Sequence, residues 1–433
     1  MPAAIAMTMT TSLETAPPPA PGDAAQETRR LKAALRRAER RRKAWALALI
    51  APLALFLLAV FAVPIGALLQ RAVDNPEVPA ALPRTVQALA GWDRAALPGE
   101  GAYAALAADL QAARSGDGVG SLARRLNQEI SGFRSLVTKT ARALPGEGAG
   151  GAASREALLA IDARWGELPY WQAIAANGGR FTDAYLLAAL DHQRDAQGHI
   201  QPAPADSAIY LDIFGRTLWI GALATLLCLV IAFPLAYWAS TLPARGANLV
   251  MIAVLIPFWT SVLVRIAAWI VLLQQSGLVN AGLQSLGLVD GPLALLFNRT
   301  GVLIAMVHIM LPFMILPLYS VMKAIPSTYQ RAAVSLGSHP FAAFWRVYVP
   351  QTYAGIAAGV LLVFITAIGY YITPALLGGP GDQMVSYYIA YFTNQTVNWG
   401  MACALGALLL AATLVLYALY QRIAQPGASA AVR

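Results

Sequence analysis

The sequence predicts an all-α polytopic membrane protein, and both its composition and the placement of its charges point to that class. Of the 433 residues, 58% are hydrophobic and 12% are charged, and the mean hydropathy is +0.56; soluble domains carry about twice that share of charge. Beyond residue 206 the only carboxylates are Asp212, Asp290 and Asp382. Two cysteines and four scattered histidines predict neither a disulfide scaffold nor a metal site. A disordered chain and an ordinary soluble enzyme are therefore excluded.

Six apolar runs are long enough to cross a membrane. The hydrocarbon core is about 30 Å thick, so about 20 helical residues are needed to span it. Each run must be helical, because a lone strand would leave its backbone N–H and C=O groups unpaired in lipid. Prolines 234, 257, 312 and 317 lie inside these runs and predict kinks, not breaks. The predicted spans are 44–69, 217–240, 249–273, 302–322, 355–372 and 401–420.

The segment before the first span, residues 1–43, predicts the orientation of the chain. Residues 1–26 are rich in Ala, Pro and Thr, which is typical of a disordered tail. A run of lysines and arginines at 29–43 follows, opposed only by Glu27 and Glu39, and this run places the N-terminus in the cytoplasm. A cleaved signal peptide is the alternative, but an apolar segment that starts after 43 residues favours an uncleaved anchor. Six spans then return the C-terminal tail, 424–433, to the cytoplasm.

Residues 70–210, between the first and second predicted spans, form an insertion of different composition. The insertion is Ala-rich, mixed in charge and interrupted by turn signals at 98–99 and 177–179. Between these breaks, apolar residues recur at helical spacing, so the sequence predicts a small helical domain on the outer side of the membrane. Two interpretations stay open: the domain either decorates the transporter or offers a docking surface to an extracytoplasmic partner.

The predicted cytoplasmic loop after the fourth span, residues 323–350, carries the most informative motif. Ser327 follows Pro326, where its side chain can cap a short helix, and Gly337 allows a left-handed exit from that helix. The loop therefore predicts a short exposed helix at about 328–336. The spacing from an Ala pair to Gly337 and on to Val-x-Val-Pro resembles the EAA loop of ABC importer permeases, a helix that sits in a groove of a separate ATPase subunit. The resemblance assigns this coupling role to Arg331, Ala332, Ala333, Gly337, Val347 and Pro350.

Further segments resemble permeases of the spermidine/putrescine type within the same family. The resemblance covers about 210–420 and the first span, but neither the tail nor the insertion. Arg331 departs from the pattern, since the family has a glutamate at that position; a compensating acid on the partner or a contact that depends on shape is implied. The similar segments are Arg-Thr-Leu at 216–218, Ile-Pro-Phe-Trp-Thr-Ser at 256–261, Leu-Pro-Phe-Met-Ile-Leu-Pro at 311–317 and Thr-Pro-Ala-Leu-Leu-Gly-Gly at 373–379.

This resemblance implies the fold, the function and the assembly. The fold would be that of a type I ABC importer permease, with the first helix at 44–69 and a core of five helices at 211–423. The chain would work in a bacterial inner membrane with a second permease subunit, two ATPase subunits and an extracytoplasmic solute-binding protein, and the solute would be a polyamine or a related organic ion. The chain contains no G-x-x-x-x-G-K-[ST] phosphate loop. We therefore expect ATP to be bound and hydrolysed on a separate subunit, and the chain itself to be no enzyme and to need no cofactor.

A membrane-embedded arginine and four aromatic residues are candidates for the translocation pathway. Arg265 lies deep within the third predicted span, where a charge is costly and by default a functional candidate. The alternative is structural, with the guanidinium bonding carbonyls that Pro257 frees. Aromatic faces can attract a cation, although packing is an equally good account of them. The aromatic candidates are Phe258, Trp259, Tyr370 and Tyr371.

Two other classes of function are weighed against the importer. A secondary transporter would show two matching halves and an ionisable site at the midplane, and six spans without such a site argue against it. A membrane-anchored receptor would use the insertion to bind a ligand, yet no predicted inner segment is long enough to form a signalling domain.

Overall fold

The computed structural model describes residues 21–114, 118–145, 155–195 and 198–424. The chain divides into two units, Met1–Ala67 and Leu68–Arg433. The first unit holds α1 (Pro21–Leu57), a π-helical turn η1 (Leu58–Ala62) and the start of α2 (Val63–Arg71). Helix α1 begins well before the predicted span at 44–69, and it includes residues 21–26, which we expected to be disordered; Ala24, Ala25 and Gln26 favour a helix. Residues 1–20 of the predicted tail lie outside the described part of the chain.

The second unit contains the remaining membrane-spanning helices. Across the described residues of both units, five helices are long and apolar enough to cross a membrane, or six if the pair Pro340–Gln351 and Tyr353–Ile368, bent by 59°, is one span. This confirms the predicted all-α polytopic class. The helices of this part are α11 (Tyr210–Thr241), α12 (Ala244–Leu255), α13 (Val262–Leu273), α14 (Leu278–Ser285), α15 (Arg299–Ala324), α19 (Tyr353–Ile368), α20 (Ile372–Leu377), α21 (Val385–Asn394) and α22 (Trp399–Ala424), with a 3-10 turn η5 at Pro380–Asp382.

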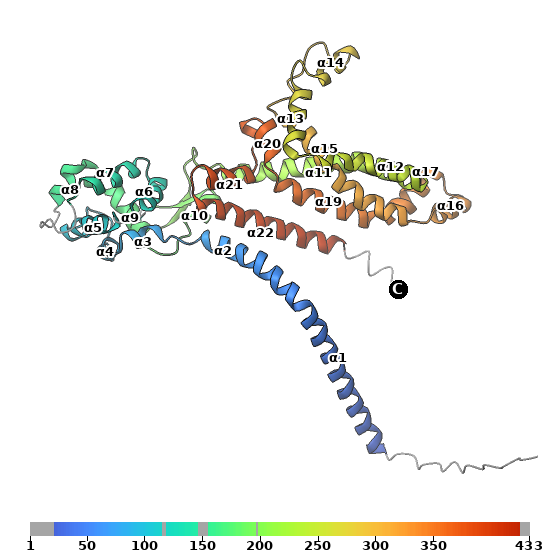
Figure 1. Ribbon diagram of the computed structural model, residues 1–433, viewed down its shortest axis with the longest axis horizontal. Coiled ribbons are helices and arrows are strands. Elements are labelled where there is room, and N and C mark those ends of the chain that lie inside the picture. Colours follow the sequence, from blue (N-terminus) through green and yellow to red (C-terminus); the bar gives the residue numbers. More distant parts are fainter. Residues whose placement is uncertain (1–20, 115–117, 146–154, 196–197, 425–433) are drawn as a thin grey trace, which may run out of the picture. The chain divides into compact units, whose positions relative to one another are not determined.

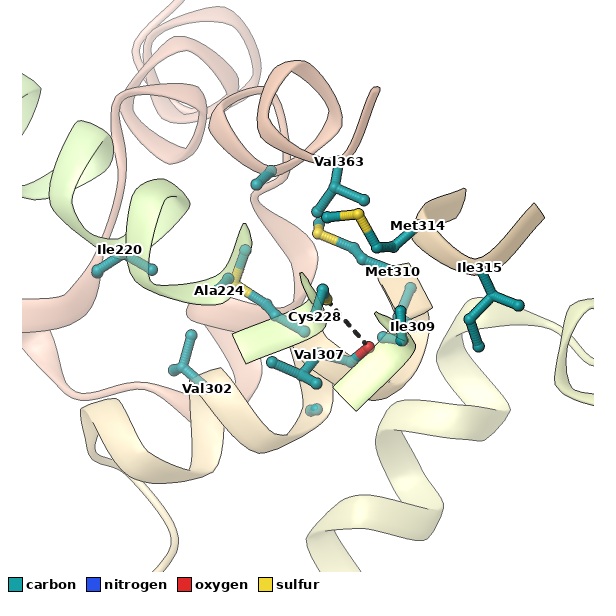
Figure 2. Packing of buried hydrophobic residues seen from close by; sticks show 14 of the residues in the cluster. Ile220, Ala224, Cys228, Val302, Val307, Ile309, Met310, Met314, Ile315 and Val363 are labelled. Carbon is teal, nitrogen blue, oxygen red and sulfur yellow. Dashed lines mark hydrogen bonds between the residues drawn. The ribbon is translucent and has the colours of Figure 1, made fainter. Parts of the chain in front are cut away.

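Helices α11, α15 and α19 pack against one another and form the core of the membrane part (Figure 1). Small residues allow the close approach: a Cβ atom on Gly359 of α19 would lie 2.7 Å from Met314 Sδ and 3.2 Å from the Met314 carbonyl oxygen of α15. Figure 2 shows Cys228 of α11 among buried aliphatic side chains, with its thiol directed at the Val307 carbonyl oxygen, 3.7 Å away. Because lipid offers no hydrophobic driving force between helices, such close packing is what holds these spans together.

The third predicted span, 249–273, is broken and not kinked, which corrects the expectation for Pro257. Helix α12 ends at Leu255, a 3-10 turn η3 (Ile256–Trp259) follows, and α13 starts only at Val262. Proline removes one intrahelical hydrogen bond and crowds the carbonyl four residues earlier. Here the extended Thr260 and Ser261 complete the break, and Thr260 donates its hydroxyl to the Pro257 carbonyl at 2.7 Å. At Pro234, Pro312 and Pro317 the helices continue.

The insertion folds into a helical lobe, which we define as residues 72–209. Its core is aromatic: Trp165 and Trp171 are fully buried with ring centroids 5.7 Å apart, and Tyr103 lies 4.5 Å from Trp171. Gly132, at φ +89°, separates two helices, although the apolar residues on both sides of it continue at helical spacing. The lobe contains α3 (Glu77–Ala81), α4 (Pro83–Ala88), α5 (Glu100–Ala113), α6 (Gly118–Glu129), α7 (Phe133–Ala143), α8 (Arg155–Ile161), η2 (Ala163–Gly166), α9 (Leu168–Ala176), α10 (Ala184–Ala189) and a small antiparallel hairpin of β1 (His192–Arg194) and β2 (Ile200–Pro202).

Two side chains attach the lobe to the membrane helices. The Asp191 carboxylate accepts the backbone N–H groups of Tyr210 at 2.9 Å and of Leu211 at 2.8 Å, so it caps the first turn of α11. Helix α10 packs on α22, where the ring of Tyr185 lies against Gly400. The lobe is therefore joined to the first turns of two different spanning helices.

Candidate functional site

The short helix predicted in the 323–350 loop is present as α16 (Thr328–Ser335). Its end is well defined: Gly337 has φ +92°, its N–H donates to the Val334 carbonyl at 3.0 Å, and the Ser338 N–H donates to the Ala333 carbonyl at 3.0 Å. This pair of bonds is a Schellman motif, which needs a residue free to adopt the left-handed conformation. The helix therefore stops where the sequence predicts, because of Gly337.

The beginning of α16 differs from the prediction for Ser327. No backbone N–H of the helix donates to the Ser327 side chain. The Ser327 hydroxyl instead accepts a hydrogen bond from Nη2 of Arg331, one turn later. One edge of the Arg331 guanidinium is therefore used for a hydrogen bond at the start of its own helix, although the side chain stays exposed.

No residue of α16 is buried, and its exposed surface mixes polar and apolar side chains. Leu336 is 88% exposed and Tyr329 and Val334 are also exposed. Of the other predicted coupling residues, Ala332, Gly337 and Pro350 are exposed, while Ala333 and Val347 are half-buried. Exposed apolar side chains on a polar loop mark a protein interaction surface. The geometry therefore suits docking of a second protein on α16.

Aromatic side chains connect this loop to the membrane helices, a link that sequence reasoning missed. Helix α16 packs on α17 (Pro340–Ala343) and on the π-helical turn η4 (Phe344–Tyr348), which leads into α18 (Val349–Gln351). Phe344 stacks on Tyr348 at 5.6 Å, and Tyr237 of α11 lies 5.2 Å from both rings. We call Tyr237, Phe344 and Tyr348 the aromatic clasp. Aromatic residues in both segments were the available signal, but nothing in the sequence paired them.

A lysine makes a second connection at the same end of the bundle. Lys323, in the last turn of α15, donates from Nζ to the carbonyl oxygens of Ser240 at 3.1 Å and Leu242 at 3.0 Å. These carbonyls belong to the C-terminal end of α11, where the negative end of the helix dipole attracts a cation. The loop that carries α16 is therefore tied to α11 by packing and by charge.

The structure brings three of the five candidate pathway residues together. The Arg265 guanidinium carbon lies 5.7 Å from the centre of the Phe258 ring, and the Arg265 charge acts electrostatically on Tyr370. Trp259 is 89% exposed and Tyr371 is 40% exposed, and no contact joins either to Arg265 among the described residues. His308 accepts a hydrogen bond from Trp269 Nε1 at 3.1 Å and also lies near Arg265.

A groove of about 1710 Å³ lies where the lobe meets α21 and α22. Its walls include Arg94, Arg124 and Arg134, none of which makes an ion pair within the described ranges. Asp183, on another wall, is bound by Arg194 at 2.5 Å, and this ion pair holds the pKa of the Asp183 carboxyl below its usual range. The groove is mixed in charge, since Asp93, Glu129 and Asp195 also line it, but its three arginines without an ion pair remain available to an acidic group. Within the described part of the chain, no cluster of His, Cys, Asp or Glu is placed to hold a metal ion.

Comparison with known proteins decides the family. Residues 218–426 match the model of the binding-protein-dependent transport system inner membrane component. The spermidine/putrescine transport system permease protein PotB of Haemophilus influenzae is 35% identical over 209 residues, which cover 48% of this chain and 73% of that protein. The chain belongs to this family of ABC importer permeases.

A second curated relative is also a permease of this type. The PotB permease of Escherichia coli is 33% identical to the chain over 196 residues, covering 45% of this permease and 71% of the relative. A crystal structure of a bacterial alginate ABC transporter in complex with a periplasmic protein matches with a TM-score of 0.42 and 18% identity, covering 50% of this chain and 78% of the other. This permease is a multi-pass inner membrane protein. The lobe lies outside the residues that match the family model.

Proposed function

We propose that the chain is the permease subunit through which an ATP-driven importer passes polyamines such as spermidine and putrescine, or a related organic ion. The proposal for the solute rests on the relatives that are named for spermidine and putrescine transport. The permease itself performs no covalent chemistry in this scheme. It needs no cofactor of its own, because ATP is bound and hydrolysed on separate subunits.

The observation that carries the coupling role is the exposed α16, with the exposed side chains of Tyr329, Val334 and Leu336 at its surface and its connection to α11 through the aromatic clasp. We propose that an ATPase subunit docks on α16 from the cytoplasm. When two ATPase subunits close on ATP, they move α16, and the clasp transmits this movement to α11. Each state of the bundle is then favoured by the ATPase conformation that binds it better, and the passage alternates between inward- and outward-facing states.

On the opposite side, the lobe is proposed to receive the solute-binding protein. The support is the groove of the lobe, where Arg94, Arg124 and Arg134 make no ion pair among the described residues and would attract acidic side chains. In this orientation both chain termini lie in the cytoplasm, in line with the basic residues before the first span. A second permease subunit completes the passage.

The test uses the complete importer, expressed with its ATPase, companion permease and binding protein, and measures ATP-dependent uptake of labelled spermidine. Gly337→Val forces a β-branched residue into a left-handed conformation, which is strained. We expect uptake to fall at least tenfold while membrane insertion stays normal. Gly282→Val is the matched control, because the added side chain meets open space and the glycine lies in α14, away from this loop. Normal spermidine uptake by G337V would contradict the coupling role, and no uptake by the unaltered importer would contradict the solute.

A further inference from the structure

Arg265 carries an uncompensated charge in the membrane part of the protein. It lies in the first turn of α13, and its Nε and Nη1 atoms are buried without a hydrogen-bond partner. This leaves Nη2 as the accessible edge of the half-buried guanidinium. The ring of Phe258 covers the charge from one side at 5.7 Å, which offsets only a small part of the cost of burial. A buried guanidinium of this kind requires a counter-ion.

The polar groups around Arg265 carry no negative charge. The buried hydroxyls of Tyr370 and Thr373 can accept a hydrogen bond, but as neutral groups they do not balance the charge of the guanidinium. His308 already accepts the Trp269 N–H on Nδ1, so its neutral ring carries its proton on the other nitrogen. What the cluster needs is therefore a negatively charged acceptor.

This chain has no carboxylate that can fill the position. Beyond residue 206 it contains only three. Asp212 is paired with Arg216 at 2.5 Å, Asp382 is paired with Arg299 at 3.1 Å, and Asp290 lies in the loop after α14. A polyamine cannot serve either, because it is itself a cation. A second copy of the chain would bring another Arg265 and no acid.

The surroundings of Arg265 are open to another membrane protein. Leu263 and Val264, which precede Arg265 in α13, are 59% and 61% exposed, and Trp259 in the preceding turn is 89% exposed. The acyl chains of lipid can cover such an apolar face, but they carry no charge to neutralise the guanidinium beside it. A helix with one carboxylate among apolar residues satisfies both requirements.

We propose that a carboxylate on a membrane helix of the companion permease pairs with Arg265. This rests on the proposed function as one half of a two-permease passage. The ion pair brings the two membrane subunits into register. It also removes from the passage a positive charge that would repel a cationic solute.

The test is a charge-reversal experiment in the complete importer. Arg265→Glu places two carboxylates against each other, and we expect the yield of assembled complex to fall at least tenfold while the single chain still inserts. Each Asp and Glu in the membrane helices of the companion permease is then replaced by Arg, one at a time, in the R265E background. One of these reversals is expected to restore assembly. The matched control is Arg194→Glu with Asp183→Arg, the reversal of a half-exposed ion pair within this chain, which should assemble without any change in the partner.

Three outcomes would overturn the proposal. The first is that Arg265→Gln assembles and imports like the unaltered protein. The second is that no reversal in the companion restores R265E. The third is that R265Q assembles normally but loses import. In that case the anion that pairs with Arg265 would belong to the solute and not to the companion permease. Assembly is measured without any solute, so a successful reversal in an importer that does not take up spermidine would retain the ion pair and reject only the proposed cargo.

Discussion

The ring of Tyr185 lies so close to Gly400 that a Cβ atom on this glycine would come within 2.3 Å of the Tyr185 Cε2 atom. Tyr185 is only 8% exposed, and the Arg125 guanidinium carbon sits 4.9 Å from the centre of its ring. This burial raises the pKa of the Tyr185 hydroxyl to about 12, so the side chain stays neutral in this contact. The pair joins α10 of the lobe to the first turn of α22, although 215 residues separate the two positions along the chain.

Replacing this glycine should loosen the lobe. We expect Gly400→Ala to destabilise the protein by about 1 to 3 kcal/mol, because a rigid, buried ring must move to admit the methyl group. Gly406→Ala, in the same helix, is the control: its Cβ meets no atom within 4 Å, so the change should be neutral or slightly stabilising. Thermal unfolding in detergent compares the two. Equal melting temperatures for G400A and G406A would refute the close contact.

Removing the Asp191 cap should destabilise the first turn of α11. We expect Asp191→Ala to cost about 0.5 to 2 kcal/mol, since two backbone N–H groups lose their acceptor. Asp191 also has φ +57°, a conformation that asparagine tolerates better than alanine, so Asp191→Asn should cost less. Hydrogen exchange at the amides of Tyr210 and Leu211 measures the effect. Unchanged exchange in D191A would argue against the cap.

The contact of α19 with α15 should not tolerate a larger residue at Gly359. Gly359→Val would drive a branched side chain into the Met314 backbone, and we expect a loss of at least about 2 kcal/mol together with poor expression. Gly359→Ala should be milder, because the flexible Met314 thioether is the nearest atom and can move. Thermal stability in detergent ranks the variants. An order in which alanine is worse than valine would contradict this packing.

The aromatic clasp should matter for coupling more than for assembly. Phe344→Ala removes the ring that contacts both Tyr237 and Tyr348. Because α16 is unchanged, we expect the ATPase to remain bound while solute uptake falls about tenfold, a loss of about 1.4 kcal/mol of coupling. The measurements are ATPase co-purification and uptake in the same preparation. Loss of the ATPase from the complex would mean that Phe344 supports docking instead.

Acid should lower the stability of the lobe, because it protonates the Asp162 carboxylate. Its carboxylate accepts hydrogen bonds from Arg164 Nε at 3.0 Å and from Lys139 Nζ at 3.1 Å, and these partners hold the pKa of Asp162 far below its usual range. A carboxyl whose pKa is lowered by folding stabilises the protein at pH values above the unfolded pKa of about 4, and this contribution fades as pH falls further. Asp162→Asn should therefore lower the melting temperature at pH 6 by more than at pH 3. An equal difference at both pH values would contradict the ion pair.

Hydropathy alone was enough to predict the membrane class, because lipid restricts what a spanning segment can be. It was not enough to predict how each proline is accommodated. Pro234 and Pro257 look alike in the sequence, yet only Pro257 ends a helix, since residues that prefer an extended backbone follow it. The expected order of spans was right, and the detail of the third was wrong.

The candidate site likewise contains one feature that the sequence could predict and others that it could not. Gly337 could be placed from a local motif, because its role depends only on backbone conformation. The aromatic clasp and the Arg125 network, in which Arg125 binds Asn75 and Asn177 over 50 and 52 residues, depend on pairing across the fold. Helical periodicity shows which residues face inward, but not which of them meet.

The attachment of the lobe to both α11 and α22 has a mechanical consequence. The Asp191 carboxylate and the Tyr185 ring connect the ends of two spans that are distant in sequence. Two helix ends connected in this way cannot separate freely, so they provide a fixed hinge line. Any widening of the bundle then has to take place among the remaining helices.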